Sequence, residues 1–149
     1  MARDQLALLI KLESDKEEKL RMDFIGAQQH LANLQRQLTG IETFRSDYLA
    51  QLQNRATEGV GGSYYNQFQQ FIGKLDDALK QQLNAINTAN KVLKQREELW
   101  LAQKAKLEAI EKLKQRKQLK QQAILAKAEQ KQLDEFATNI FVRNRKTLA

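Results

Sequence analysis

The chain has 149 residues, of which 29% are charged, and it contains no proline and no cysteine. This composition excludes disulfides and thiolate metal sites, and it is typical of long helices that share a thin apolar seam rather than of a globular core. The formal net charge of +7 favours acidic partners, a class that includes nucleic acid, anionic lipid and acidic protein surfaces.

Membrane-spanning and secretory signals are both missing from the sequence. No run approaches the roughly 18 apolar residues that a membrane-spanning helix requires. The N-terminal stretch "MARDQLALLIKLESDKEEKL" has acidic residues directly after a short apolar run and lacks a signal-peptide cleavage pattern. Together with the absence of cysteine, which fits a reducing compartment, these features predict a cytosolic protein.

The first predicted helix covers about residues 3–56. Its apolar side chains recur at alternating steps of four and three, which is the heptad spacing of a coiled-coil seam. The seam positions are Leu20, Phe24, Ala27, Leu31, Leu34, Leu38, Ile41, Arg45, Tyr48 and Leu52. Glu13 and Glu17 continue the same spacing towards the N-terminus, so this end of the seam is predicted to be polar.

A glycine-rich stretch, "EGVGGS", follows at residues 58–63. It matches neither nucleotide-phosphate pattern, because no strand precedes it and no lysine lies nearby. We therefore predict a turn over about residues 57–63 rather than a phosphate site, with Ser63 as the candidate N-cap of the next helix.

The second predicted helix covers about residues 64–141 and repeats the heptad spacing. Its seam positions are Phe68, Ile72, Leu75, Leu79, Gln82, Ile86, Ala89, Leu93, Arg96, Trp100, Gln103, Leu107 and Ile110. Folding the chain at Val60 places Tyr48 opposite Ile72 and Leu20 opposite Trp100. The predicted fold class is therefore all-α, with residues 1–149 forming one domain, a monomeric antiparallel coiled-coil hairpin of two long helices.

The second helix is predicted to be longer than the first, so its end has no partner. Residues 120–149 are expected to overhang as a single helix or to form a disordered tail, and they are a candidate binding segment because an isolated helix is poorly ordered without contacts. An acid-free basic run precedes this segment, formed by Lys112, Lys114, Arg116, Lys117 and Lys120.

Two apolar stripes accompany the seam near the turn. Phe44 and Phe71 each lie one position away from a seam residue. The stripe around Phe44 contains Gln37, Ile41 and Tyr48, and the stripe that starts at Phe71 contains Leu75, Ala78 and Gln82. Such a patch is wider than a two-helix seam requires, which leaves two interpretations open: a broader core or self-association, and a face that docks a partner.

Other classes of function fit less well. A basic-zipper protein has its basic region before a parallel dimeric seam, whereas here the basic run lies mid-helix among glutamates, so no nucleic-acid partner is predicted. A membrane-surface helix would need a larger apolar face. The single histidine, His30, lies beside the seam, and a slender hairpin offers no pocket for catalysis, so we expect no enzyme, no cofactor and no metal site.

Three stretches resemble a known family, the flagellar type III export protein FliJ. They are "YYNQFQQFIGKLDDAL" at 64–79, "REELWLAQKAKLEAIEKL" at 96–113 and "AEQKQLDEFATNIFVRNR" at 128–145. The aromatic start of the second helix, Trp100 and "LDEFA" carry the match, which extends over essentially the whole chain.

The resemblance implies a non-enzymatic component of bacterial flagellum biogenesis, and hence of motility and chemotaxis. FliJ-like proteins are antiparallel coiled coils similar to the gamma subunit of the F-type ATPase. They insert into the hexameric flagellar export ATPase, promote its ring formation, link it to the export gate protein FlhA and assist export chaperones. The implied location is the cytoplasm, at the inner face of the membrane at the flagellar base, with membrane association only through the export apparatus.

The resemblance also implies two sets of binding residues. The export-gate surface would comprise Gln37, Ile41, Phe44, Tyr48, Phe71, Leu75, Ala78 and Gln82. The surface that enters the ATPase ring would comprise Leu6, Ile10, Glu13, Glu17, Leu20, Trp100, Lys104, Leu107 and Lys114. Two alternatives stay open: the stalk protein of a needle-type secretion system, and a self-associating structural coiled coil.

Overall fold

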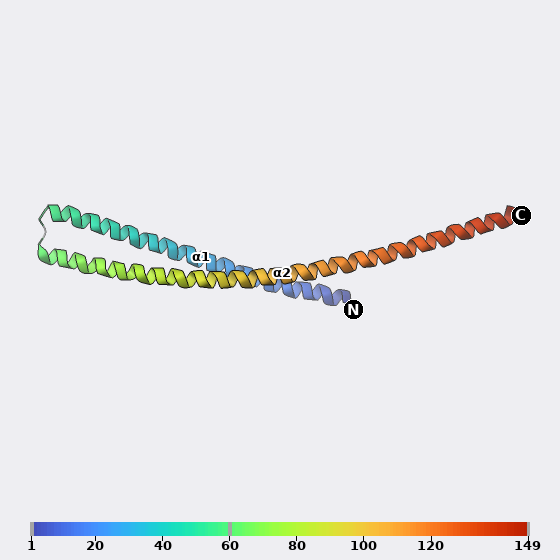
Figure 1. Cartoon of the computed structure of the whole chain (residues 1–149), viewed down its shortest axis with the longest axis horizontal. Coiled ribbons are helices and arrows are strands. Elements are labelled where there is room, and N and C mark those ends of the chain that lie inside the picture. Colours follow the sequence, from blue (N-terminus) through green and yellow to red (C-terminus); the bar gives the residue numbers. More distant parts are fainter. Residues whose placement is uncertain (1, 60, 149) are drawn as a thin grey trace. The chain divides into compact units, whose positions relative to one another are not determined.

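The computed structural model describes residues 2–59 and 61–148, and these ranges form two α-helices (Figure 1). Helix α1 spans Ala2–Thr57 with 56 residues, and helix α2 spans Gly62–Leu148 with 87 residues. No strand occurs within these ranges. Because proline is absent, no residue removes a backbone donor from either helix, so each continues without interruption. The all-α prediction is confirmed, and so is the greater length of the second helix.

Helix α1 ends in a hydrogen-bonded turn that depends on a glycine. The backbone N–H of Glu58 donates to the carbonyl of Arg55 at 3.1 Å, and that of Gly59 donates to the carbonyl of Ala56 at 3.3 Å. Gly59 has a φ of 82°, in the left-handed region that a residue with a Cβ adopts only at a cost. Gly59 therefore ends the helix in the manner of a C-terminal glycine cap.

Helix α2 begins earlier than the sequence analysis placed it. The carbonyl of Gly61 accepts a hydrogen bond from the backbone N–H of Tyr65 at 3.2 Å, and the helix starts at Gly62. Ser63, predicted to cap this helix, instead lies inside its first turn, because glycines at 61 and 62 provide the helix start. Val60, the predicted fold point, lies outside the described residues.

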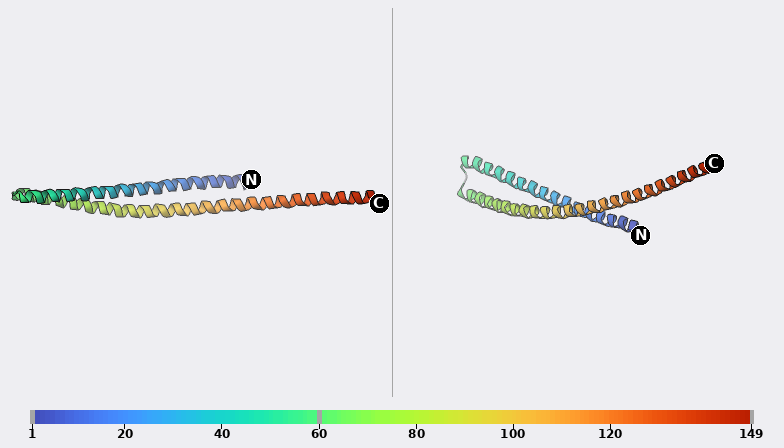
Figure 2. Two further views of the ribbon diagram at one scale, coloured as in Figure 1. Left: turned by 90° about the horizontal axis from the view of Figure 1, so that it is seen from above. Right: turned by 45° about the vertical axis from the view of Figure 1, so that its right-hand side comes forward.

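Asp15–Lys104 form one compact unit, which we call the turn unit. Within it, α1 and α2 run antiparallel and side by side away from the turn (Figure 2). Near the turn itself, Arg55 of α1 donates a hydrogen bond to the hydroxyl of Tyr64 and lies 5.1 Å from the centre of its ring. The predicted antiparallel hairpin is therefore confirmed.

The core of the turn unit is the predicted seam. Its buried apolar residues are Leu52, Phe68, Ile72, Ile86 and Ala89. The other predicted seam residues of this unit are half-buried, with one exception. Arg96 is exposed, and its guanidinium lies 3.5 Å from the carboxylate of Asp23. A long cationic side chain in a two-helix seam can reach solvent, and there it meets an acid on α1.

Contacts between the helices define the register. The ring of Tyr48 stacks on Phe68 with centroids 4.1 Å apart and lies 4.5 Å from that of Phe71, rather than facing Ile72 alone. Each side chain of a coiled coil packs among several residues of the facing helix, so a one-to-one pairing was too simple. The Nε of Arg45 donates to a carboxylate oxygen of Asp76 at 2.7 Å in the same antiparallel register.

A second compact unit, the terminal unit, comprises Met1–Ser14 and Ala105–Ala149. Among its described residues, Leu6, Ile10, Leu107 and Ile110 are half-buried. After Lys114, every side chain of residues 115–147 is exposed, so this part of α2 is a single helix without a partner from α1. Within the described ranges, neither helix has a segment long and apolar enough to cross a membrane.

Candidate interaction surfaces

A cluster of three aromatic rings lies on the flank of the seam near the turn. Phe44 packs edge-on against Phe71, with ring centroids 6.1 Å apart, and stacks with Tyr48 at 6.2 Å. Phe44 is nevertheless 52% exposed, whereas Tyr48 and Phe71 are half-buried. We call Phe44, Tyr48 and Phe71 the aromatic face. An exposed ring held by two neighbours is a preorganised apolar contact surface.

The structure brings the two predicted stripes together along this flank. Beyond the aromatic face, the Nε2 of Gln82 donates to the Oε1 of Gln37 at 3.1 Å and to the carbonyl of Leu34 at 2.8 Å. The remaining predicted gate residues, Ile41, Leu75 and Ala78, are half-buried. Of the eight residues, only Gln37 and Phe44 are exposed. Most of the eight predicted gate residues are therefore partly covered by the seam, and Phe44 is the most accessible apolar residue among them.

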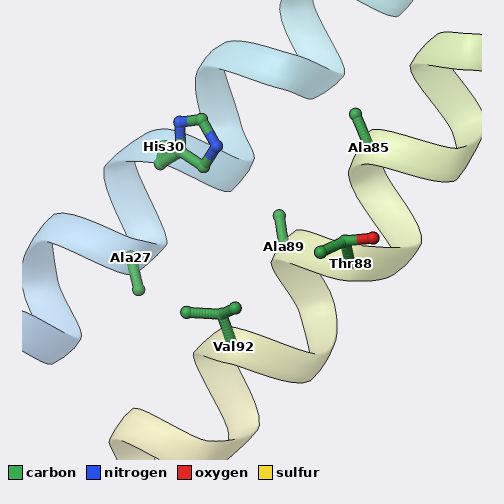
Figure 3. A pocket seen from close by; sticks show the side chains of 6 residues that line it. All are labelled: Ala27, His30, Ala85, Thr88, Ala89 and Val92. Carbon is green, nitrogen blue, oxygen red and sulfur yellow. The ribbon is translucent and has the colours of Figure 1, made fainter.

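A groove opens further along α1 and α2 within the turn unit (Figure 3). Its volume is about 460 Å³, and it is lined by Ala27, His30, Ala85, Thr88, Ala89 and Val92. Small side chains on both helices leave this space, because alanine fills less of the seam than the leucines and isoleucines of other layers. Sequence reasoning placed His30 correctly beside the seam but missed the groove. The small residues Ala27 on α1 and Ala85 and Ala89 on α2 were the available signal.

The predicted ring-binding residues of the turn unit surround Trp100. Its ring stacks on Phe24 with centroids 5.4 Å apart, its Nε1–H donates to the carboxylate of Glu17 at 2.9 Å, and the ammonium of Lys104 lies 5.5 Å from the ring centre. Phe24 and Glu17 flank Leu20, the residue predicted opposite Trp100. The carboxylate of Glu17 is thus tied to the seam by a hydrogen bond instead of being left free in it.

Glu13 is the polar centre of the terminal unit. It is only 3% exposed, and its carboxylate lies 3.3 Å from the ammonium of Lys106, which is itself mostly exposed. A charge buried to this extent requires a partner, because desolvation of an unpaired carboxylate is costly. The other predicted ring-binding residues of this unit, Leu6, Ile10, Leu107 and Lys114, are half-buried.

The unpartnered end of α2 carries large apolar side chains in solvent. Leu119, Leu133, Phe136 and Phe141 are each more than 60% exposed. The basic run lies just before them, and Lys112, Arg116, Lys117 and Lys120 are exposed. Among the described residues, no group of three or more His, Cys, Asp or Glu side chains could hold a metal ion. The exposed apolar side chains at this end of α2 are the feature that could contact another macromolecule.

Comparison with known proteins gives one family. The family model described as flagellar FliJ protein matches residues 1–146, nearly the full chain. No curated protein and no solved structure matches the chain significantly.

Proposed function

Because the chain belongs to the flagellar FliJ family and is thus a component of the flagellar export apparatus, we propose that it is the central stalk of the hexameric export ATPase and links that ring to the export gate. In this proposal the hairpin transmits position between the two partners and carries out no chemistry itself. It acts in the cytoplasm, at the inner face of the membrane, where it also assists export chaperones.

The observation that carries the proposal is that one seam has two kinds of layer. Near the turn most layers are apolar, with Leu52, Phe68 and Ile72 buried, and an exposed Phe44 adjoins them. Towards the chain termini the layers contain carboxylates, with Glu17 bonded to Trp100 and Glu13 paired with Lys106. A rod that moves within a ring needs contacts that form and break, and polar surfaces meet that need better than a continuous apolar one.

The aromatic face is the proposed contact for the gate protein FlhA. Aromatic side chains are the residue type most often responsible for the binding energy of protein interfaces, especially where neighbouring residues already hold them in place. Phe44 meets this condition, since Tyr48 and Phe71 hold its ring while half of it remains accessible. The residues around Trp100 and Glu13 are the proposed contacts for the ATPase ring.

The direct test is to mix the protein with the purified flagellar export ATPase and to measure ATP hydrolysis and ring formation. We expect both to increase. Phe44→Ala is the matched control, because Phe44 is proposed to contact the gate and not the ring, so this variant should stimulate the ATPase as the unaltered protein does. An ATPase whose hydrolysis and assembly are both unchanged by the protein would contradict the stalk.

Self-association is a second candidate that the exposed Phe44 favours, since a ring that is 52% exposed could also pack against another copy. Sedimentation at micromolar concentration separates the two. The adaptor is expected to sediment as a monomer. A stable dimer that Phe44→Ala dissociates would instead assign the aromatic face to self-contact.

A further inference from the structure

The whole net charge of the chain lies on the end of α2. Residues 112–149 contain ten Lys and Arg against three Asp and Glu, whereas residues 1–111 contain fifteen of each kind. The rest of the chain is therefore electrically balanced, and the formal +7 belongs to this end alone. In the described part of this end, every side chain of residues 115–147 is exposed. A cationic helix without a partner attracts anionic surfaces.

The same end of α2 carries an apolar stripe. Five apolar residues follow the spacing i, i+3, i+4, i+7 and i+8, which places them on one side of the helix. They are Leu133, Phe136, Ala137, Ile140 and Phe141, and we call them the terminal stripe. The four larger side chains are between 43% and 66% exposed. The terminal stripe is thus wider than the two columns of a coiled-coil seam, and it has no cover from α1.

A cation lies beside each edge of the terminal stripe. Arg143 lies seven positions after Phe136, and Arg145 lies four positions after Phe141, so the two arginines border opposite edges. Both are exposed. They belong to a run without an acid, because residues 142–147 contain no Asp and no Glu.

The nearby acids leave the stripe continuous. Glu129 lies one turn before Leu133 on the same side and marks where the stripe begins. The Oδ1 of Asp134 accepts a hydrogen bond from the Nε2 of Gln130 at 3.2 Å, and Glu135 lies on the opposite side of the helix. From Phe136 onward, the described side chains on and beside the stripe therefore carry no negative charge.

An anionic lipid surface fits this arrangement better than another helix does. A single partner helix covers two apolar columns, so part of the five-residue stripe would remain in water. A second copy of the chain would bring an end with the same excess of cations against this one. A lipid surface covers the full width of a stripe, and its headgroup phosphates meet cations on both edges. The seam of the hairpin is too narrow for such a contact, whereas the terminal stripe is not.

We propose that residues 133–146 form an interfacial helix that binds anionic phospholipid. The terminal stripe lies at the boundary between headgroups and acyl chains, and Arg143 and Arg145 extend to the phosphates beside it. The contact is direct and is separate from the association through the export apparatus that the resemblance implies. It uses none of the residues proposed to bind the ATPase ring or the gate, so it can fail while the proposed function stands.

The first test measures co-flotation of the full chain with lipid vesicles. One set contains phosphatidylglycerol mixed with phosphatidylethanolamine, and the other contains phosphatidylcholine alone. We expect the anionic vesicles to bind at least about tenfold more tightly, and this binding to weaken as the salt concentration rises.

A matched pair of substitutions tests the terminal stripe. Ile140 and Val142 are both β-branched and both 43% exposed, and they lie about 200° apart around the helix. Ile140→Glu places a carboxylate in the stripe, whereas Val142→Glu adds the same charge on the opposite side. We expect vesicle binding to weaken at least about tenfold for Ile140→Glu and less than about threefold for Val142→Glu, with equal helix content by circular dichroism.

A second pair tests the arginines. The double substitution Arg143→Gln with Arg145→Gln removes two charges beside the stripe, and Lys91→Gln with Lys94→Gln removes two exposed charges from the turn unit. We expect at least about tenfold weaker binding for the first pair and less than about threefold for the second, because attraction to lipid headgroups falls off within a Debye length.

Equal losses within either pair would overturn the proposal, because the effect would then be one of net charge alone. Equal binding to both kinds of vesicle would do the same. If the unaltered chain binds no vesicles and forms a dimer that Ile140→Glu dissociates, the stripe belongs to a second copy. A chain that binds no vesicles but still stimulates the ATPase loses the lipid site and keeps the proposed function.

A fluorescent label tests the orientation of the helix on the lipid. The chain has no cysteine, so Ala137→Cys and Asn139→Cys each provide one thiol, the first in the stripe and the second away from it. With an environment-sensitive fluorophore, anionic vesicles should shift the emission of the label at 137 to shorter wavelength and leave that at 139 nearly unchanged. Equal shifts at both positions, or none at 137, would contradict insertion of the terminal stripe.

Discussion

The turn unit and the terminal unit have the same helical heptads but differ in what those heptads bury. Among the described residues, the five buried apolar ones, Leu52, Phe68, Ile72, Ile86 and Ala89, all belong to the turn unit. The buried residue of the terminal unit is a glutamate, Glu13. In both units the heptad spacing determines which side chains face the other helix. The polarity of those side chains determines how much their packing stabilises the helix pair.

The difference assigns distinct properties to the two units. An apolar layer contributes stability in proportion to the area that it removes from water, so the turn unit should set the unfolding free energy of the hairpin. A layer with a carboxylate gains less from burial, and the exposed residues after Lys114 gain nothing from α1. We therefore expect the terminal unit to contribute less than the turn unit to the unfolding free energy.

The comparison is tested most strongly by removing the same ring from each unit. Phe68 is 3% exposed and stacks on Tyr48, whereas Phe136 is 65% exposed. We expect Phe68→Ala to lower the unfolding free energy by about 3 kcal/mol, the usual cost of deleting a buried aromatic ring. Phe136→Ala should change it by less than about 0.5 kcal/mol. Urea unfolding followed by circular dichroism measures both.

A similar loss from Phe136→Ala would show that the end of α2 packs against something in solution, and the contrast between the units would fail. An unchanged urea midpoint of unfolding for Phe68→Ala would also contradict the comparison, because the turn unit would then not be the main source of the unfolding free energy.

The second test asks whether the rings of the aromatic face act in binding rather than in folding. The double substitution Phe44→Ala with Phe71→Ala should weaken gate binding by at least tenfold, which corresponds to about 1.4 kcal/mol. Helix content and ATPase stimulation should be retained, because the buried seam and the terminal unit are intact. Calorimetric titration of the purified gate domain measures the loss. Unaltered affinity would show that the gate binds elsewhere.

The seam could be predicted from the sequence because a heptad repeat specifies which residues share a helix face. Leu52, Phe68 and Ile72 are buried as that repeat predicted. The start of α2 could not be predicted in the same way, because Ser63 fits a cap by residue type and the choice among adjacent glycines depends on local backbone geometry. The periodicity of a sequence predicts which residues share a helix face, but it does not predict the residue at which a helix begins or ends.

The candidate sites were predicted only in part. Spacing identified Phe44 and Phe71 as neighbours on one flank, and the rings do meet. It placed Glu13 in the seam but did not predict its ion pair, because the seam pattern contains no information on Lys106, which lies one step outside the seam and reaches the carboxylate. The groove depends on the volumes of facing alanines, which a one-helix pattern does not compare.

The third test converts the polar layer of the terminal unit into an apolar one. Glu13→Leu removes a buried carboxylate whose partner, Lys106, can return to water at little cost, as its side chain is 58% exposed. We expect the unfolding free energy to rise by about 1 kcal/mol, since replacing a buried ion pair by an apolar residue is commonly neutral or stabilising. The matched control is Glu18→Leu, an exposed position, with a change below about 0.5 kcal/mol. A clear loss of stability would mean that the Glu13–Lys106 pair holds the unit together.

The smallest expected effect comes from deleting residues 120–149. Every side chain described from 120 to 147 is exposed, so the deletion removes helix but no packing against α1. We expect the helical signal to fall in proportion to the residues removed, and the unfolding free energy measured at Trp100 to change by less than about 0.5 kcal/mol. The tryptophan is a suitable probe because it is the only one in the chain and stacks on Phe24 within the turn unit. A larger change would mean that the end of α2 contributes to the seam, and the two units would then share one source of stability.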